Sequence, residues 1–345
     1  MANTYYSYQD IILKPNYSKF LSRDDVNVST QFGPRQFQMP VVPANMTCVI
    51  NSELARWMSA NDYFYIMHRF NVDHTHPANK DNREFLQMAN EENWKTISIS
   101  VGVKEEDREF LKFVAENKYR VDYITIDIAH AHSIRMKEML EFVRGITFDA
   151  KLKAIHPSGL TAEVVLPHQP FIIAGNVATP EAVRDLEDWG ADCVKVGIAQ
   201  GDACTTYGQT GFGVPMFSCM LECAAVATRP IIADGGIRMN GDFAKALVAG
   251  GSMVMAGSIF AACIDSPAES VVHLDHDNAV SKRYYGSASE HNKGSHRHIE
   301  GRMVELPCNG MTYVEKLEEV KGALQSSFSY SGGDIYGIDW GIIHK

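Results

Sequence analysis

The chain contains 345 residues, 45% of them hydrophobic, and carries a formal net charge of −10. This length predicts one large domain or two ordinary ones, with enough apolar side chains for a sizeable core. Three protein classes are disfavoured: no run approaches the roughly 18 apolar residues of a membrane span, the start lacks a secretory pattern, and an acidic chain without a basic run is a poor nucleic-acid binder.

Short apolar runs alternate with helix-length spacers along the chain. The runs are apolar on both faces, as expected of parallel strands covered by helices. In chain order they are Met39–Pro43, Tyr63–Met67, Ile97–Val101, Asp122–Ile126, Phe171–Ala174, Asp192–Val196, Pro230–Ala233 and Ser252–Ala256. The spacer after the fifth run shows the helix signals well, with Thr179 as N-cap, Pro180 in the first turn and Gly190 at the end.

Repetition of this unit predicts one (β/α)8 TIM barrel over residues 1–345, with catalytic loops and a flap at the C-terminal face. An open doubly wound sheet is the alternative, weakened because no G-x-G-x-x-G follows the first strand. The connection between the fourth and fifth strands, about residues 145–170, is long enough for an extra loop or hairpin. A polar stretch at about residues 286–303 has the composition of an active-site flap.

Polar residues follow the ends of the predicted strands, where a barrel would bring them to one mouth. They are Asn45, His68, Arg69, Asp127, Asn176, Cys204, Asp234 and Ser258. Some of them would serve equally well as helix N-caps. The turns "ADGGIR" and "AGSIF" are candidate phosphate sites, because glycine lets backbone N–H groups approach an anion. Asp234 would accept hydrogen bonds from ribose hydroxyls.

Cysteine usage separates one thiol from the rest. The chain has seven cysteines and no Cys-x-x-Cys spacing, which fits a reduced cytoplasmic protein better than a disulfide scaffold or zinc ribbon. Most thiols are expected in the core. Cys204 instead lies in a glycine-rich loop beside Thr205 and Thr206, where a nucleophile is the alternative to a structural thiol.

A metal site is a further alternative. Asp127, His130 and His132 would bind zinc if they converged. A second group of histidines lies in the predicted flap: His291, His296 and His298. The histidines are scattered, so surface or hydrogen-bonded roles are favoured.

Over almost its whole length the chain resembles the IMP dehydrogenase/GMP reductase family. The order and spacing of the matching motifs make the resemblance specific. They are "PVVPANM", "NDYFYIMHRF", "ISISVGVKE", "ITIDIAHAHS", "IIAGNVATPEAV", "GADCVKVGIAQGDACTT", "TGFG", "RPIIADGGIRMNGD", "MVMAGSIFA", "YYGSASE" and "IEG". The reductase branch is favoured because no regulatory module interrupts the barrel and the flap is short, without the Arg-Tyr pair that activates water in the dehydrogenases.

The resemblance implies NADPH-dependent conversion of GMP to IMP and ammonia through a cysteine thioimidate. Cys204 would be the nucleophile, and Thr206 and Glu300 would relay protons. The implied substrate-binding residues are Asp202, Asp234, Gly235, Gly236, Gly257, Ser258, Gly286, Ser287, Ala288, Arg297 and Gly301. The implied cofactor-binding residues are Ser22, Arg23, Asp127, Ile128, Ala129, Ile198, Ala199, Ser326, Ser327 and Tyr330, the last three reaching a neighbouring subunit of a homo-oligomer, a tetramer in the family.

The loop before Cys204 departs from the family pattern. Loop carbonyls hold a monovalent cation such as K+ in the family, which would place it at Ala199, Gly201 and Cys204; here Ala199 and Gln200 replace a Gly-Pro pair. Asp202 stands where the family has a serine or a basic residue near the 5′-phosphate, and a carboxylate about 4 Å from a phosphate costs several kcal/mol. Either Asp202 turns away, or the ligand is not an ordinary monophosphate.

Three other functional hypotheses compete with that of a GMP-reducing enzyme. The first is a family paralogue acting on a modified purine nucleotide or nucleoside, and the second is a nucleotide-binding pseudoenzyme. The third is a metal hydrolase. NADPH oxidation across a panel of purines would separate the first two from the reductase, and metal analysis would test the third.

Overall fold

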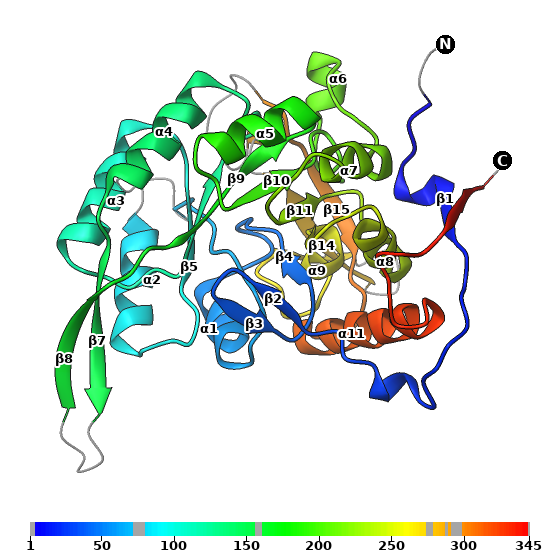
Figure 1. Cartoon of the computed structure of the whole chain (residues 1–345), viewed down its shortest axis with the longest axis horizontal. Coiled ribbons are helices and arrows are strands. Elements are labelled where there is room, and N and C mark those ends of the chain that lie inside the picture. The colour runs from blue at the N-terminus through cyan, green and yellow to red at the C-terminus, as the bar shows by residue number, and fades with distance from the viewer. Residues whose placement is uncertain are drawn as a thin grey trace.

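The computed structural model describes residues 4–71, 80–155, 161–273, 279–286, 289–290 and 299–343. Its centre is a seven-stranded parallel sheet in the order β4-β12-β11-β10-β9-β6-β5 (Figure 1). The strands are β4 (Val41–Pro43), β5 (Ser98–Val101), β6 (Tyr123–Asp127), β9 (Phe171–Val177), β10 (Cys193–Val196), β11 (Ile231–Asp234) and β12 (Met253–Ala256). Seven of the predicted strands are therefore present, and the α/β class is confirmed.

The segment 63–67, predicted as a strand, is not one in the structure. It lies against β5, where the Met67 N–H donates to the Ser98 carbonyl at 3.2 Å. The Ser100 hydroxyl donates to the Met67 carbonyl at 2.6 Å, so a side chain takes a position that a ladder N–H would fill. The apolar character of segment 63–67 correctly predicted that it is buried. At the Met67 carbonyl, however, the Ser100 hydroxyl takes the place of a backbone donor.

Helices follow the strands and cover the sheet (Figure 1). They are α1 (Ser52–Ala60), α2 (Lys80–Glu91), α3 (Glu105–Glu116), α4 (Ile134–Gly145), α5 (Pro180–Asp188), α6 (Thr206–Thr210), α7 (Met216–Ala224), α8 (Asn240–Val248), α9 (Ser258–Ala261) and α11 (Tyr313–Tyr330). α5 begins as predicted: the Thr179 side chain accepts from the Ala182 N–H, and Pro180 opens the helix. None of the described helices is both long and apolar enough to cross a bilayer.

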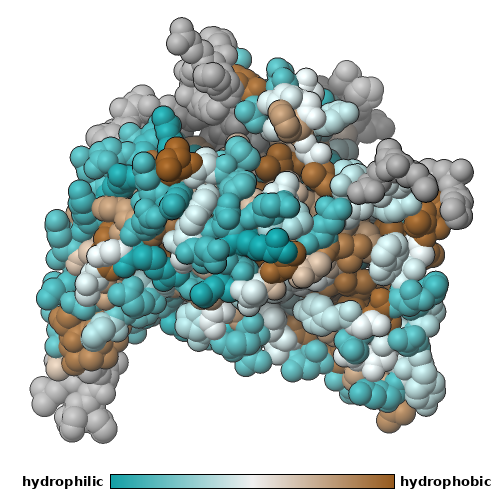
Figure 2. All heavy atoms as spheres, turned by 45° about the horizontal axis from the view of Figure 1, so that its top comes forward, coloured by the Kyte–Doolittle hydropathy of each residue, from teal (hydrophilic) through white to brown (hydrophobic). Residues whose placement is uncertain are grey.

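Smaller antiparallel elements surround the parallel sheet. β1 (Ile11–Leu13) pairs with β16 (Trp340–Ile342), and β2 (Thr30–Phe32) pairs with β3 (Arg35–Phe37). A third sheet contains β13 (Ser270–His273), β14 (Ala279–Tyr285) and β15 (Met303–Pro307). The long connection after α4 forms the hairpin of β7 (Asp149–Ile155) and β8 (Thr161–Pro167), which projects from the body (Figure 1). Hydrophobic side chains are exposed on this arm (Figure 2).

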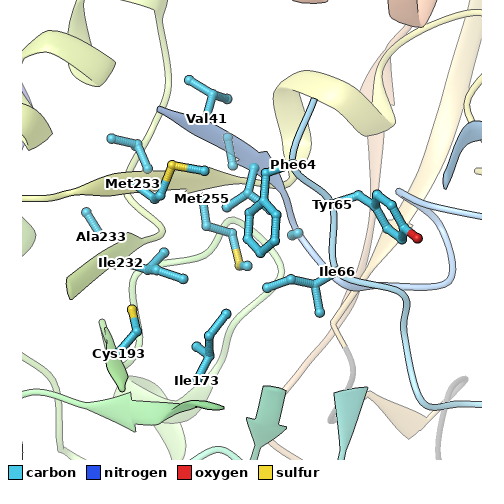
Figure 3. Close-up of a cluster of buried hydrophobic side chains, with 14 of the residues drawn as sticks. Val41, Phe64, Tyr65, Ile66, Ile173, Cys193, Ile232, Ala233, Met253 and Met255 are labelled. Atoms are coloured by element: carbon cyan, nitrogen blue, oxygen red, sulfur yellow. The ribbon is translucent and has the colours of Figure 1, made fainter. Parts of the chain in front are cut away.

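Apolar side chains fill the space inside the sheet. Phe64 lies among residues from several strands, including Ile173, Ile232 and Met255 (Figure 3). At the amino ends of the strands, the Phe32 ring of the β2–β3 hairpin stacks on Tyr123 with centroids 6.1 Å apart, and the Tyr123 hydroxyl donates to the Phe32 carbonyl at 2.6 Å. Aromatic side chains therefore pack across this end of the sheet.

Candidate active site

A cavity of about 730 Å³ lies at the carboxyl ends of the parallel strands. The predicted site residues that line it are Asp127, Ile128, Ala129, Ile198, Ala199, Gly201, Asp202, Cys204, Thr206, Asp234, Gly235, Gly236, Gly257, Ser258, Gly286 and Glu300. Gly301 adjoins them through a β-bridge to Cys204. Ser287, Ala288, Arg297 and the histidines at 291, 296 and 298 lie outside the described residues.

A hydrogen-bonded chain of three side chains runs through the cavity wall. Cys204 Sγ lies 3.2 Å from Thr206 Oγ1, which donates to Glu300 Oε2 at 2.8 Å. The thiol is partly exposed and unpaired with any other cysteine. This arrangement joins a thiol to a carboxylate through a hydroxyl, and such a path is suited to proton transfer near the thiol.

Main-chain hydrogen bonds join the two distant segments that carry these three side chains. The Thr205 N–H donates to the Glu300 carbonyl at 2.9 Å, and the Arg302 N–H donates to the Ala203 carbonyl at 2.8 Å. Glu300 is therefore positioned by the backbone of the loop that carries Cys204, although it comes from the segment before β15.

A buried lysine organises the cavity floor. Lys195 Nζ lies 2.9 Å from Asp127 Oδ1 and 2.7 Å from Asp234 Oδ2, and it also donates to Asn176 Oδ1. Burial alone would raise the pKa of Asp127, but the Lys195 ammonium holds that pKa below its ordinary value. Asp127 and Asp234 in turn raise the pKa of Lys195 against the effect of burial. Lys195 and Asp127 therefore stay ionised at neutral pH, and Asp234 is fixed by donors on its Oδ2 atom.

Two glycines leave room where backbones and a tyrosine approach closely. A Cβ on Gly197, which has φ +141°, would lie 2.1 Å from the Asp234 carbonyl oxygen. A Cβ on Gly257 would lie 2.3 Å from the Tyr284 hydroxyl. Only glycine fits at either place, so the turns after β10 and β12 can pack against their neighbours.

Asp202 does not stand alone in the cavity wall. Its Oδ1 atom lies 2.6 Å from Arg238 Nη1, and Arg238 also lines the cavity. The carboxylate is thus neutralised by a guanidinium from the turn after β11. Its charge alone is no longer an argument against an ordinary monophosphate ligand.

The loop around Ala199 keeps a conformation that favours glycine. Ala199 has φ +65°, which costs an L-residue about 1 kcal/mol. The Gly201 carbonyl accepts the Cys204 N–H at 3.1 Å.

The zinc alternative finds no support within the described ranges, where no cluster of three or more His, Cys, Asp or Glu side chains could hold a metal. His132 instead pairs with Asp185 at 2.7 Å.

The other predicted cofactor residues form a separate group at the surface. Arg23 donates to the Tyr330 hydroxyl at 3.0 Å and to Ser326 Oγ at 3.3 Å, and its guanidinium lies 5.2 Å from the centre of the Tyr330 ring. Ser22 caps the turn that carries Arg23. Ser327 donates within α11, to the Ala323 carbonyl at 2.9 Å. None of these residues lines the cavity described above.

Lys195, Arg238 and Tyr284 are among the cavity residues that were missed as site residues in the sequence. Lys195 had a readable signal, since a lysine inside an apolar parallel strand is buried and requires partners. Arg238 ends the "ADGGIR" turn, which was singled out only for its glycines, and Tyr284 had no signal, because only the fold shows that it faces the cavity.

Comparison with known proteins gives the family of the chain. A family model described as IMP dehydrogenase / GMP reductase domain matches residues 5–335. The chain is 43% identical over 330 residues to a GMP reductase of Leptothrix cholodnii, covering 95% of this chain and 91% of that protein. It is 44% identical over 331 residues to a GMP reductase of Mesoplasma florum, covering 95% and 93%. A GMP reductase of Staphylococcus carnosus is 43% identical over 330 residues, covering 95% and 92%. The chain therefore belongs to the IMP dehydrogenase/GMP reductase family.

Proposed function

We propose that this chain is a GMP reductase, an oxidoreductase that uses NADPH to convert GMP into IMP with release of ammonia. The observation that carries the proposal is the Cys204–Thr206–Glu300 chain in the wall of a nucleotide-sized cavity. The relatives named GMP reductase cover 95% of the chain, which supports the same assignment.

The reaction requires a nucleophile, a proton path and a hydride. Cys204 Sγ forms a bond to C2 of the guanine, and the C2–N bond breaks when the departing amine takes a proton through Thr206 and Glu300. The product of this step is a thioimidate and ammonia. A reduced nicotinamide, when bound, supplies the hydride to C2. The C–S bond then breaks, and the thiolate of Cys204 is regenerated with IMP.

The cavity offers groups suited to each part of GMP. Asp234, held by Lys195, would accept hydrogen bonds from the ribose hydroxyls. Gly257 and Ser258 would approach the phosphate, with Gly235 and Gly236 on the adjacent turn. Gly286 and Gly301 border the space beside Cys204, where the base would lie.

The dinucleotide would be held at two places. Asp127 to Ala129 and Ile198 to Ala199 line the cavity near the thiol. The exposed platform of Arg23 and Tyr330 combines a cation with an aromatic face, which suits a ligand that carries both phosphates and a base. We propose that this platform, with Ser22, Ser326 and Ser327, serves a neighbouring copy in a homo-oligomer, a tetramer by family resemblance.

We extend the proposal to the architecture and the loop cation. The described parallel sheet has β4 and β5 as its edge strands, and segment 63–67 lies against β5. We propose that this segment takes the place of the eighth strand and closes the barrel between β5 and β4. The whole chain is then one barrel domain, with the β7–β8 hairpin and a flap at about residues 286–303 as additions. The carbonyls of Ala199, Gly201 and Cys204 are the proposed K+ position, supported by the glycine-like φ of Ala199.

The test is NADPH oxidation with GMP, with IMP and ammonia measured as products. Cys204→Ala should abolish turnover and leave the fold intact, since the thiol is partly exposed. Cys308→Ala removes another partly exposed thiol, from outside the cavity, and should turn over normally. Absence of IMP with the natural chain, or an active Cys204→Ala variant, would overturn the proposal.

A further inference from the structure

The Asp202–Arg238 ion pair is built into the part of the cavity that would face the phosphate. Arg238 Nη2 donates to the Gln200 carbonyl at 3.4 Å, and the Gly236 N–H donates to the same oxygen at 3.2 Å. A Cβ on Gly235 would lie 3.0 Å from Gln200 Cβ. The loop carrying Asp202 therefore packs directly on the turn that carries Arg238.

The turn after β12 lines the same cavity as the ion pair. Tyr284 is buried with its hydroxyl against Gly257. Burial first, then the charges of Cys48, Asp202 and Asp234, raise the pKa of Tyr284, whereas Arg238 lowers it. Asp202, Arg238 and Gly257 also line the same cavity, so the ion pair and the Gly257 turn border one space.

We propose that Arg238 is the residue that makes this site select a 5′-phosphate, and that Asp202 is a positioning residue that holds the guanidinium toward the cavity. The proposal rests on the proposed function and names the group that recognises its substrate. A guanidinium has five N–H donors in a planar fork, so contacts to Asp202 and Gln200 are compatible with donation to a phosphate oxygen. The negative charge of Asp202 offsets part of the attraction between the Arg238 guanidinium and the phosphate.

The proposal predicts opposite changes in KM for GMP when the two members of the pair are replaced. Arg238→Ala removes a charge-assisted hydrogen bond and leaves Asp202 facing the phosphate, so KM for GMP should rise about 10- to 100-fold with little change in kcat. Asp202→Asn keeps an oxygen that accepts from Arg238 but removes the charge, so KM for GMP should fall about three- to tenfold. Guanosine lacks the phosphate, and its binding should not follow either trend.

Calorimetric titration with GMP and with guanosine tests this without turnover. The matched control is Arg229→Ala, because Arg229 pairs with Asp192 at 3.5 Å, is exposed to a similar degree, and lies outside the cavity lining. Arg238→Lys should recover part of the GMP affinity. Thermal unfolding of each variant shows that the fold persists, as expected for a side chain that is 40% exposed.

Three results would overturn the proposal. They are unchanged GMP affinity in Arg238→Ala, equal losses for GMP and guanosine, or weaker guanosine binding in Asp202→Asn. The last would mean that Asp202 contacts a hydroxyl and selects a ligand without phosphate. Failure of the proposed function looks different: the natural chain would bind GMP with the Arg238 dependence described but would not oxidise NADPH.

Discussion

Replacing Lys195 with methionine would leave Asp127 and Asp234 facing each other without their shared cation. Lys195 is 3% exposed and lies within 2.9 Å of both carboxylates. Methionine fills a similar volume, so the loss is mainly electrostatic. Breaking a buried ion pair by removing one partner costs about 3–5 kcal/mol.

The expected thermal shift follows from the size of the chain. Unfolding entropy of about 2.1 cal/mol/K per residue gives about 0.7 kcal/mol/K over 345 residues. A loss of about 3–5 kcal/mol therefore lowers Tm by about 4–7 °C. The matched control is Lys95→Met, because Lys95 pairs with Asp62 at 2.9 Å but is 54% exposed, and such a pair contributes less than about 1 kcal/mol.

The pH dependence has a definite sign. In the natural chain the pKa of Asp127 is depressed, so its contribution is present above the ordinary value of about 3.9 and is lost as pH falls through the folded value. In Lys195→Met, burial without the ammonium would raise the pKa of Asp127, and acidification would then restore stability. Calorimetry of both proteins at about pH 5 and 8 should show a smaller Tm difference at the lower pH. A Lys195→Met variant as stable as Lys95→Met at pH 8 would refute the reasoning.

Two further predictions concern the proton path and the cavity floor. Glu300→Gln should slow GMP reduction by about 100-fold or more. Formation of NADPH from IMP and NADP+ in a single turnover should be slowed less. The reason is that only GMP reduction requires protonation of the departing amine. Equal losses in the two assays would contradict this separation. Gly197→Ala should lower soluble yield and Tm sharply, since its Cβ would meet the Asp234 carbonyl at 2.1 Å. Gly322→Ala, in α11 with open space around it, should be neutral or stabilising by up to about 1 kcal/mol; a Gly197→Ala variant equal to it would show that the backbone yields.

The strands were predictable because apolar runs bounded by turns carry a local signal. Segment 63–67 shows the limit: burial and extension were predicted, but periodicity says nothing about whether Ser100 or a backbone N–H would take the Met67 carbonyl. The length of the connection before Phe171 allowed a loop or a hairpin. Only the observed register of β7 and β8 decides between them.

The site was predictable to the extent that its chemistry is local or family-like. Cys204 and Thr206 lie two residues apart, and Glu300 came from the family motif rather than from any spacing. The partner of Asp202 could not be predicted, because Arg238 lies in the turn after β11 and meets Asp202 only when the turns after β10 and β11 lie side by side in the fold. Long-range charge pairing is a property of the fold, so the sequence alone presents Asp202 as an isolated carboxylate, whereas the structure pairs it with Arg238.

The main-chain bonds between the nucleophile loop and the segment from Glu300 to Arg302 have a consequence for timing. Because Thr205 and Arg302 donate across the two segments, the thiol and its proton relay cannot part without breaking both bonds. If this side of the cavity opens to release product, Glu300 would therefore move away from the Cys204 loop in a single event, and the proposed proton path would be broken while the product leaves. Amide hydrogen exchange at Thr205 and Arg302 would show that event as one shared rate.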